Sequence, residues 1–137
     1  MEQLPAANQV SAFRCLIADD SEFARKNIGK IIASLGGTII GEAIDGNEAV
    51  TMYGRLRPDL VLMDVTMPEL DGVSALRMIL AMDEAAKVII VSAVGHKEMI
   101  WKALCIGAKH YVTKPYAPDY AGMIIQSVIR GNGGRTA

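Results

Sequence analysis

Acidic, hydroxyl and ammonium side chains stand directly after short apolar runs at four places in the chain. They are Asp19, Asp20, Asp64, Ser92 and Lys114. If three carboxylates share one crevice, they repel one another, and a hard divalent cation such as Mg²⁺ would relieve that repulsion. A carboxylate beside such a cation can attack a phosphoryl group and become an aspartyl phosphate. An ammonium and a hydroxyl can then bind the phosphoryl oxygens, so the set predicts Mg²⁺-dependent phosphorylation.

These side chains can meet only if the apolar runs are neighbouring strands. The chain alternates short apolar runs, at 13–18, 38–43, 59–63, 87–91 and 110–113, with amphipathic stretches at 21–35, 47–56, 72–82, 97–106 and 119–130. The third and fourth runs are apolar throughout, which is typical of strands covered on both faces of a parallel sheet. Five strand–helix units predict an α/β domain with a flavodoxin-like, doubly wound parallel sheet of strand order 2-1-3-4-5.

In such a sheet, ligands bind at the carboxyl ends of the strands, where strands 1 and 3 part. Asp19 and Asp20 follow the first expected strand and Asp64 follows the third. Ser92 and Lys114 follow the next two strands at the same rim. A lone aspartate after a strand is usually a helix cap, and a lone lysine is usually solvated. The coincidence at one rim favours a functional site.

Composition sets the outer limits of this prediction. The chain has 137 residues, 51% of them apolar, and a formal net charge of −1. One domain with a buried core is expected, and the balanced charge favours neither a nucleic acid nor a membrane as partner. No signal peptide or spanning run is recognised, so a cytoplasmic protein is expected. We expect a disordered extension at 1–12, the domain at 13–130 and a flexible tail at 131–137.

Two local expectations accompany this organisation. Asn47 is expected to cap the second helix. Cys15 and Cys105 lie in apolar runs without metal-ligand spacing, so both are expected to be buried and reduced.

Four sequence runs resemble the response-regulator receiver family, and the resemblance covers residues 14–130. In order, they are LIADDSEFAR, DLVLMDVTMPELDG, VIIVSA and AKHYVTKP. Any one of them is weak, whereas all four in the family's order and spacing are highly specific. The resemblance implies a protein that receives a phosphoryl group from a histidine kinase, with Mg²⁺ as cofactor.

The family pattern also implies roles for single residues. Asp64 matches the phosphorylated aspartate. Asp20 matches the direct carboxylate ligand of Mg²⁺, and Asp19 its partner, which acts mostly through water. The backbone carbonyl of Thr66 matches the remaining protein ligand. Position 66 is Thr, whereas several relatives have Asn or another polar or charged residue there. The family pattern places this side chain near the path of the attacking water, so the rate of dephosphorylation is left open.

The remaining roles concern the switch between two conformations. Lys114 matches the lysine that pairs with the phosphoryl group, and the bond from Lys114 to Pro115 falls where the family usually has a cis peptide. Ser92 matches the hydroxyl residue that turns toward the phosphoryl group. Tyr111 matches the aromatic residue that moves inward as Ser92 turns. An ordinary exposed strand tyrosine is the alternative reading of Tyr111.

The resemblance further implies how the signal leaves the protein. No output domain follows the fifth helix, so output is expected to be protein binding through the face of helix 4, strand 5 and helix 5. Trp101, the sole tryptophan, is expected to point outward there. The runs look most like those of a CheY-like, single-domain chemotaxis regulator. Its partners would be a CheA-like histidine kinase, a flagellar motor switch or other target protein, and a phosphatase.

Other functions remain open at this level. Stand-alone receivers also serve as phosphorelay intermediates or phosphate sinks. Haloacid-dehalogenase-like phosphatases use an aspartate after a strand, but they need a second acid two residues on, where this chain has Thr66. A dinucleotide site is disfavoured because no G-x-G-x-x-G follows the first strand. We therefore expect a protein that is phosphorylated rather than a turnover enzyme.

Overall fold

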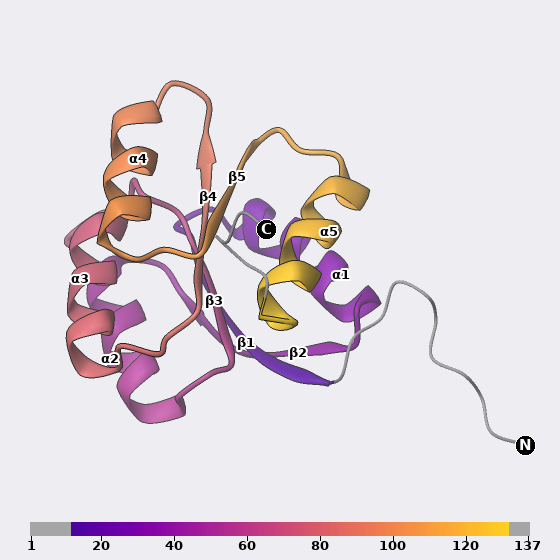
Figure 1. Cartoon of the computed structure of the whole chain (residues 1–137), viewed down its shortest axis with the longest axis horizontal. Coiled ribbons are helices and arrows are strands. Elements are labelled where there is room, and N and C mark those ends of the chain that lie inside the picture. The colour runs from indigo at the N-terminus through magenta and orange to yellow at the C-terminus, as the bar shows by residue number, and fades with distance from the viewer. Residues whose placement is uncertain (1–11, 132–137) are drawn as a thin grey trace, which may run out of the picture.

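A five-stranded parallel sheet with helices on both faces forms the domain (Figure 1). The computed structural model describes residues 12–131, so the expected extension at 1–12 and the expected tail at 131–137 lie outside the described residues except for residues 12 and 131. The strands are β1 (Phe13–Ala18), β2 (Gly37–Ala43), β3 (Leu60–Met63), β4 (Val88–Ala93) and β5 (His110–Lys114). The helices are α1 (Glu22–Ser34), α2 (Gly46–Leu56), α3 (Gly72–Met82), α4 (Lys97–Ile106) and α5 (Pro118–Ile129). The strand order β2-β1-β3-β4-β5 confirms the predicted topology.

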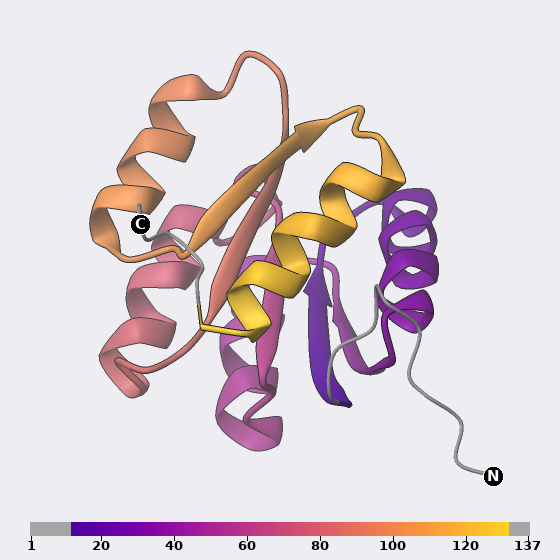
Figure 2. The same cartoon turned by 45° about the vertical axis from the view of Figure 1, so that its right-hand side comes forward.

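The sheet separates two apolar clusters. One is covered by α2, α3 and α4, and the other by α1 and α5, as Figure 1 and Figure 2 show from two directions. β3 supplies both: Val61 and Met63 face the first cluster, whereas Leu60 and Leu62 face the second. Because successive strand side chains point to opposite faces, a strand covered on both sides must be apolar throughout. That requirement explains the unbroken run LVLM.

The start of α2 corrects the predicted helix cap. Asp45 is the N-cap residue, and its carboxylate accepts the backbone N–H of Glu48 at 2.8 Å. The Glu48 carboxylate accepts in turn the backbone N–H of Ile44 at 2.9 Å. The predicted cap, Asn47, lies inside the helix. An N-cap acid followed three residues later by glutamate is similar to a capping box, except that the glutamate here accepts from the residue before the cap. The pattern begins the helix two residues earlier than a cap at Asn47 would.

The two cysteines differ in burial. Cys15 is buried in β1, and burial raises the pKa of its thiol. Cys105 is exposed on α4, so the expectation of burial was wrong for it. The buried residues of α4 are Ile100 and Ala103. Cys105 follows Ala103 by two positions, which turns its side chain about 200° around the helix and away from the sheet.

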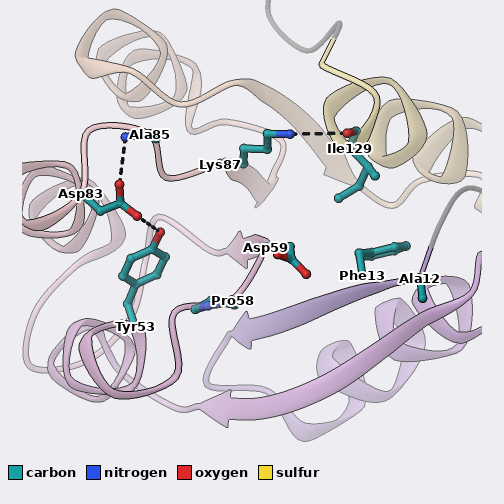
Figure 3. Close-up of a pocket in the computed structure, with 9 residues that line it drawn as sticks. All are labelled: Ala12, Phe13, Tyr53, Pro58, Asp59, Asp83, Ala85, Lys87 and Ile129. Carbon is teal, nitrogen blue, oxygen red and sulfur yellow. Dashed lines mark hydrogen bonds between the residues drawn. The ribbon is translucent and has the colours of Figure 1, made fainter.

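The amino ends of the strands surround a cavity of about 370 Å³ (Figure 3). There the Tyr53 hydroxyl donates to Asp83 Oδ2 at 2.7 Å and so ties α2 to the end of α3. Across the cavity, Lys87 Nζ donates to the carbonyl of Ile129 at 3.4 Å. Among residues 12–131, none of the helices has the length and apolar character needed to cross a membrane.

Candidate functional site

The opposite rim of the sheet gathers the three predicted aspartates. Backbone ladders extend one residue past the strands: Asp64 N donates to Ala18 O at 2.9 Å, and Asp19 N donates to Ala43 O at 3.0 Å. These bonds fix Asp19 and Asp64 side by side at the switch point. Carboxylate oxygens of Asp19, Asp20 and Asp64 lie within 4.8 Å of one another. Asp19 and Asp64 are only 5% and 7% exposed, whereas Asp20 faces solvent.

Lys114 bridges the two buried carboxylates. Its Nζ lies 2.7 Å from Asp19 Oδ2 and 3.2 Å from Asp64 Oδ2. Burial of the ammonium lowers the pKa of Lys114, but the hydrogen bond to Asp19 and the charges of Asp64 and Asp19 outweigh it, so the net pKa is raised. Lys114 is therefore charged at neutral pH. The following bond to Pro115 is cis, as the resemblance implied.

The remaining oxygens of the buried pair are also bonded. Asp19 Oδ1 accepts the backbone N–H of Ser21 at 2.9 Å. Asp64 Oδ1 accepts the Thr66 backbone N–H at 3.1 Å and its hydroxyl at 3.4 Å. Within the part of the chain that the structure describes, the Asp20 carboxylate makes neither a hydrogen bond nor an ion pair. Asp20 is thus the acid of the three that is most open to a cation.

Gly72 supports the backbone of Asp64 by its lack of a side chain. Its N–H donates to Val65 O at 2.9 Å, and it is the first residue of α3. A Cβ placed on Gly72 would collide with the carbonyl oxygen of Asp64 and lie 2.7 Å from Val65 Cα. The structure shows that the place of Gly72 is fixed by this close approach of α3 to the site.

Ser92 lies within β4, one residue before the strand ends, and is 0% exposed. Its Oγ lies 2.8 Å from Nδ1 of His96, the residue that precedes α4. Sequence reasoning did not select His96. A serine and a histidine four residues apart across a strand-to-helix turn form no recognisable motif, and only the turn geometry brings them together.

A groove between α4 and β5 lies beside Ser92. Ser92 pairs with Thr113 in the β4–β5 ladder, and Thr113 and the half-exposed Tyr111 line a groove of about 570 Å³. Lys97, Glu98, Ile100, Trp101 and Leu104 of α4 complete the lining. Trp101 is 69% exposed, which confirms its predicted outward direction.

Comparisons with known proteins agree with this geometry. Residues 15–125 match the response regulator receiver domain family. The chain is 44% identical over 118 residues to the chemotaxis protein CheY of Treponema pallidum, covering 83% of this chain and 82% of the relative. It is also 44% identical over 106 residues to CheY of Thermotoga maritima, covering 77% and 88%.

A solved structure adds the same likeness in three dimensions. It is the crystal structure of the CheX–CheY–BeF₃–Mg²⁺ complex from Borrelia burgdorferi, which matches with a TM-score of 0.81 at 38% identity. The match covers 85% of this chain and 88% of that one. On the sequence match, the strand order and the shared fold, the chain belongs to the response regulator receiver domain family.

Proposed function

We propose that this receiver domain accepts a phosphoryl group on Asp64 and signals by binding other proteins in a CheY-like chemotaxis system. The observation that carries the proposal is the ion pair between Asp64 Oδ2 and Lys114 Nζ, 3.2 Å apart. It lies beside Asp19 and Asp20 at the switch point of the sheet. A carboxylate nucleophile, a fixed cation and two further acids at one rim match the needs of phosphoryl transfer.

The chain's own residues carry out the transfer. A carboxylate oxygen of Asp64 forms a bond to phosphorus, while the bond from phosphorus to the donor's histidine nitrogen breaks and leaves its electron pair on that nitrogen. Lys114, already within hydrogen-bond distance of Asp64, offsets charge on the phosphoryl oxygens. Ser92 supplies a hydroxyl that donates to one of these oxygens once its side chain turns toward Asp64.

The donor set fits Mg²⁺, because three carboxylates offer hard oxygen ligands within a small space. Asp20 and Asp64 would ligate the ion directly, with the Thr66 backbone carbonyl. Asp19, whose oxygens accept hydrogen bonds from Ser21 and Lys114, would act mostly through water, as the family pattern implies. When bound, Mg²⁺ neutralises charge that develops on the transferred group.

We assign the output to the face formed by α4, β5 and α5. The groove beside Tyr111 and the exposed Trp101 give this face an apolar centre, as protein interfaces commonly have. The CheY relatives support a CheA-like kinase as donor and a flagellar motor switch or another target as reader. The CheX–CheY complex supports a CheX-like partner, to which we assign phosphatase action.

Two other functions are less well supported. A phosphorelay intermediate or phosphate sink needs no surface that a target reads, whereas this chain has Tyr111 at the edge of an apolar groove. A turnover phosphatase would need a second acid two residues after Asp64, and that position is Thr66. Multiple-turnover release of phosphate from small phosphoesters would favour the phosphatase instead.

Labelling with radioactive acetyl phosphate and Mg²⁺ tests the phosphoacceptor. The wild-type chain should acquire a hydroxylamine-sensitive acyl phosphate, and Asp64→Asn should acquire none, because an amide oxygen is a poor nucleophile. Asp119→Asn makes the same chemical change on exposed α5 and should label as the wild type does. Undiminished labelling of Asp64→Asn would overturn the assignment.

A further inference from the structure

The side chain proposed to bind the phosphoryl group is held by a histidine. Ser92 Oγ and His96 Nδ1 are 2.8 Å apart, and Ser92 is fully buried. Among residues 12–131, Ser92 Oγ has this hydrogen bond and none with Asp64. If the hydroxyl donates to Nδ1 in this bond, the Ser92 side chain must turn away from the imidazole before it can donate to a phosphoryl group on Asp64.

His96 makes this bond at the expense of capping its own helix. The N-cap residues of α1, α2 and α3 accept a backbone N–H with their side chains. His96 occupies the same position in α4, yet no side-chain cap hydrogen bond forms there. An imidazole nitrogen could accept such an N–H. Its use for Ser92 instead ties the end of β4 to the start of α4.

If the Ser92 hydroxyl donates to His96 Nδ1, it cannot donate to a phosphoryl group at the same time. A serine hydroxyl has one hydrogen to donate, and phosphoryl oxygens only accept. We propose that His96 Nδ1 accepts this hydrogen in the unphosphorylated protein, so that His96 is a positioning residue that holds Ser92 in its resting orientation. The inference rests on the proposed phosphorylation of Asp64.

Release of His96 links the rim to the output groove. Lys97 and Glu98 follow His96 directly and line the groove together with Trp101. When Ser92 turns to the phosphoryl group, the residue that precedes α4 loses this hydrogen bond to β4. The Ser92–His96 bond therefore stabilises the resting conformer, and its loss shifts the population toward the active one.

The affinity for beryllofluoride with Mg²⁺, a stable stand-in for the phosphoryl group, measures this equilibrium. His96→Ala should raise the affinity about two- to tenfold, the range expected for removing one net hydrogen bond from the resting state. His96→Asn places an amide oxygen near the former Nδ1 and should keep the wild-type affinity. Val94→Ala changes an exposed residue of the same turn and should have no effect. Isothermal titration gives all four affinities.

A second variant and a spectroscopic measurement make the test decisive. In the Ser92→Ala background, His96→Ala should have no further effect, because the bond is already absent. In the wild-type protein, adding beryllofluoride and Mg²⁺ should move the ¹⁵N chemical shift of His96 Nδ1. The shift should change from the value of a nitrogen that accepts a hydrogen bond toward that of one that accepts none. The other histidine, His110, is distinguished by its His110→Gln variant.

Clear outcomes would overturn the proposal. Unchanged or weakened binding in His96→Ala, a gain that persists without the Ser92 hydroxyl, or an unmoved His96 signal would each do so. The proposed function fails separately: a wild-type chain that takes neither beryllofluoride nor acetyl-phosphate label is no phosphoacceptor, whatever His96 does.

Discussion

At the scale of single residues, Asp20 is the acid of the rim whose charge is least compensated. Lys114 pairs with Asp19 and Asp64, whereas Asp20 faces solvent beside two like charges. In the absence of a divalent cation, that arrangement is repulsive. The same negative charges attract a cation. Removing the charge of Asp20 should therefore raise the stability of the metal-free fold and lower the affinity for the metal.

We therefore expect Asp20→Asn to stabilise the protein by about 1 kcal/mol in chelator-containing buffer, the size of one exposed like-charge contact. The same variant should lose most of the stabilisation that Mg²⁺ gives the wild-type chain, because a direct ligand is gone. Urea unfolding with chelator and with Mg²⁺ measures both effects.

Glu84→Gln is the matched control for this experiment, since it removes one exposed negative charge at the other end of the sheet. It should leave both the stability and the Mg²⁺ response nearly unchanged. If Asp20→Asn destabilised the metal-free protein, or responded to Mg²⁺ as the wild type does, Asp20 would not be an uncompensated metal ligand.

The residues of the site that stand at strand ends could be predicted from the sequence. The hydrogen bond that links Ser92 to the start of α4 could not. Asp19, Asp64 and Lys114 follow from the sequence because the carboxyl ends of parallel strands converge on one rim. The partner of Ser92 does not follow, because His96 reaches it only through a turn in which Gly95 has a φ of 98°. Turn geometry of this kind leaves no periodic trace in the sequence.

At the scale of elements, the approach of α3 to the end of β3 depends on Gly72. Gly72→Ala should destabilise the domain by about 1–3 kcal/mol or more, since the added methyl group meets the backbone of Asp64 and cannot be relieved by a side-chain rotation. It should also slow acetyl-phosphate labelling, because the displaced backbone carries the nucleophile. Urea unfolding and labelling rates provide the two measurements.

Gly29→Ala on α1 is the matched control. A Cβ there would lie 4.0 Å from Ile17 Cδ1, an ordinary contact. Replacing a mid-helix glycine by alanine should stabilise the domain by about 0.5–1 kcal/mol, since alanine loses less conformational entropy on folding. If the two substitutions changed the free energy of unfolding by equally small amounts, the contact between Gly72 and the backbone of Asp64 would not restrict position 72 to glycine.

The link between α2 and α3 should depend on pH. The hydrogen bond from Tyr53 is the main cause that holds the pKa of Asp83 below its ordinary value of 3.8. A lowered carboxyl pKa contributes stability that is complete above the ordinary value and is lost as pH falls through the lowered one. Tyr53→Phe should thus lower the melting temperature by a few degrees at neutral pH, and the difference should narrow below pH 3.8.

Thermal unfolding followed by circular dichroism across the acid range checks this sign. When Tyr53→Phe is compared with its parent in the Asp83→Asn background, the difference in melting temperature should not narrow at low pH, because no carboxylate remains at position 83 to titrate. A difference between wild type and Tyr53→Phe that stayed constant into the acid range would show that the hydroxyl acts by packing alone.

The helices and strands were predicted from the apolar pattern of the sequence, because that pattern reflects burial. Details that the pattern does not record, such as a helix cap, were missed. All five strands were placed from their apolar runs. β1, β3 and β4 are buried along most of their length, and the edge strands β2 and β5, although only partly buried, still carry enough apolar residues to be recognised. Asn47 was chosen as a cap because asparagine is a common one. The helix begins earlier because Asp45 accepts the backbone N–H of Glu48, while the Glu48 carboxylate accepts that of Ile44. Cys105 was expected to be buried from its apolar neighbours, although its angular position on α4 turns it outward.

At the scale of the whole molecule, the rim and the groove are neighbours, whereas the cavity of Figure 3 lies at the other end of the strands. Ser92 pairs with Thr113 of the groove, and α4 begins at Lys97, directly after His96, the hydrogen-bond partner of Ser92. A change at Asp64 can thus reach the groove through one strand pair and one turn.

Amide hydrogen exchange with and without beryllofluoride and Mg²⁺ tests this spatial separation. Ligand binding alone stabilises the folded state and should slow exchange of core amides that open by global unfolding. The first turn of α4 should instead exchange faster, because the residue that precedes α4 loses its hydrogen bond to β4. The amides of β2, at the far edge of the sheet, should show no acceleration. In Asp64→Asn, the faster exchange in the first turn of α4 should be absent. If exchange in the wild-type protein slowed uniformly throughout the domain, the ligand would bind without moving the groove.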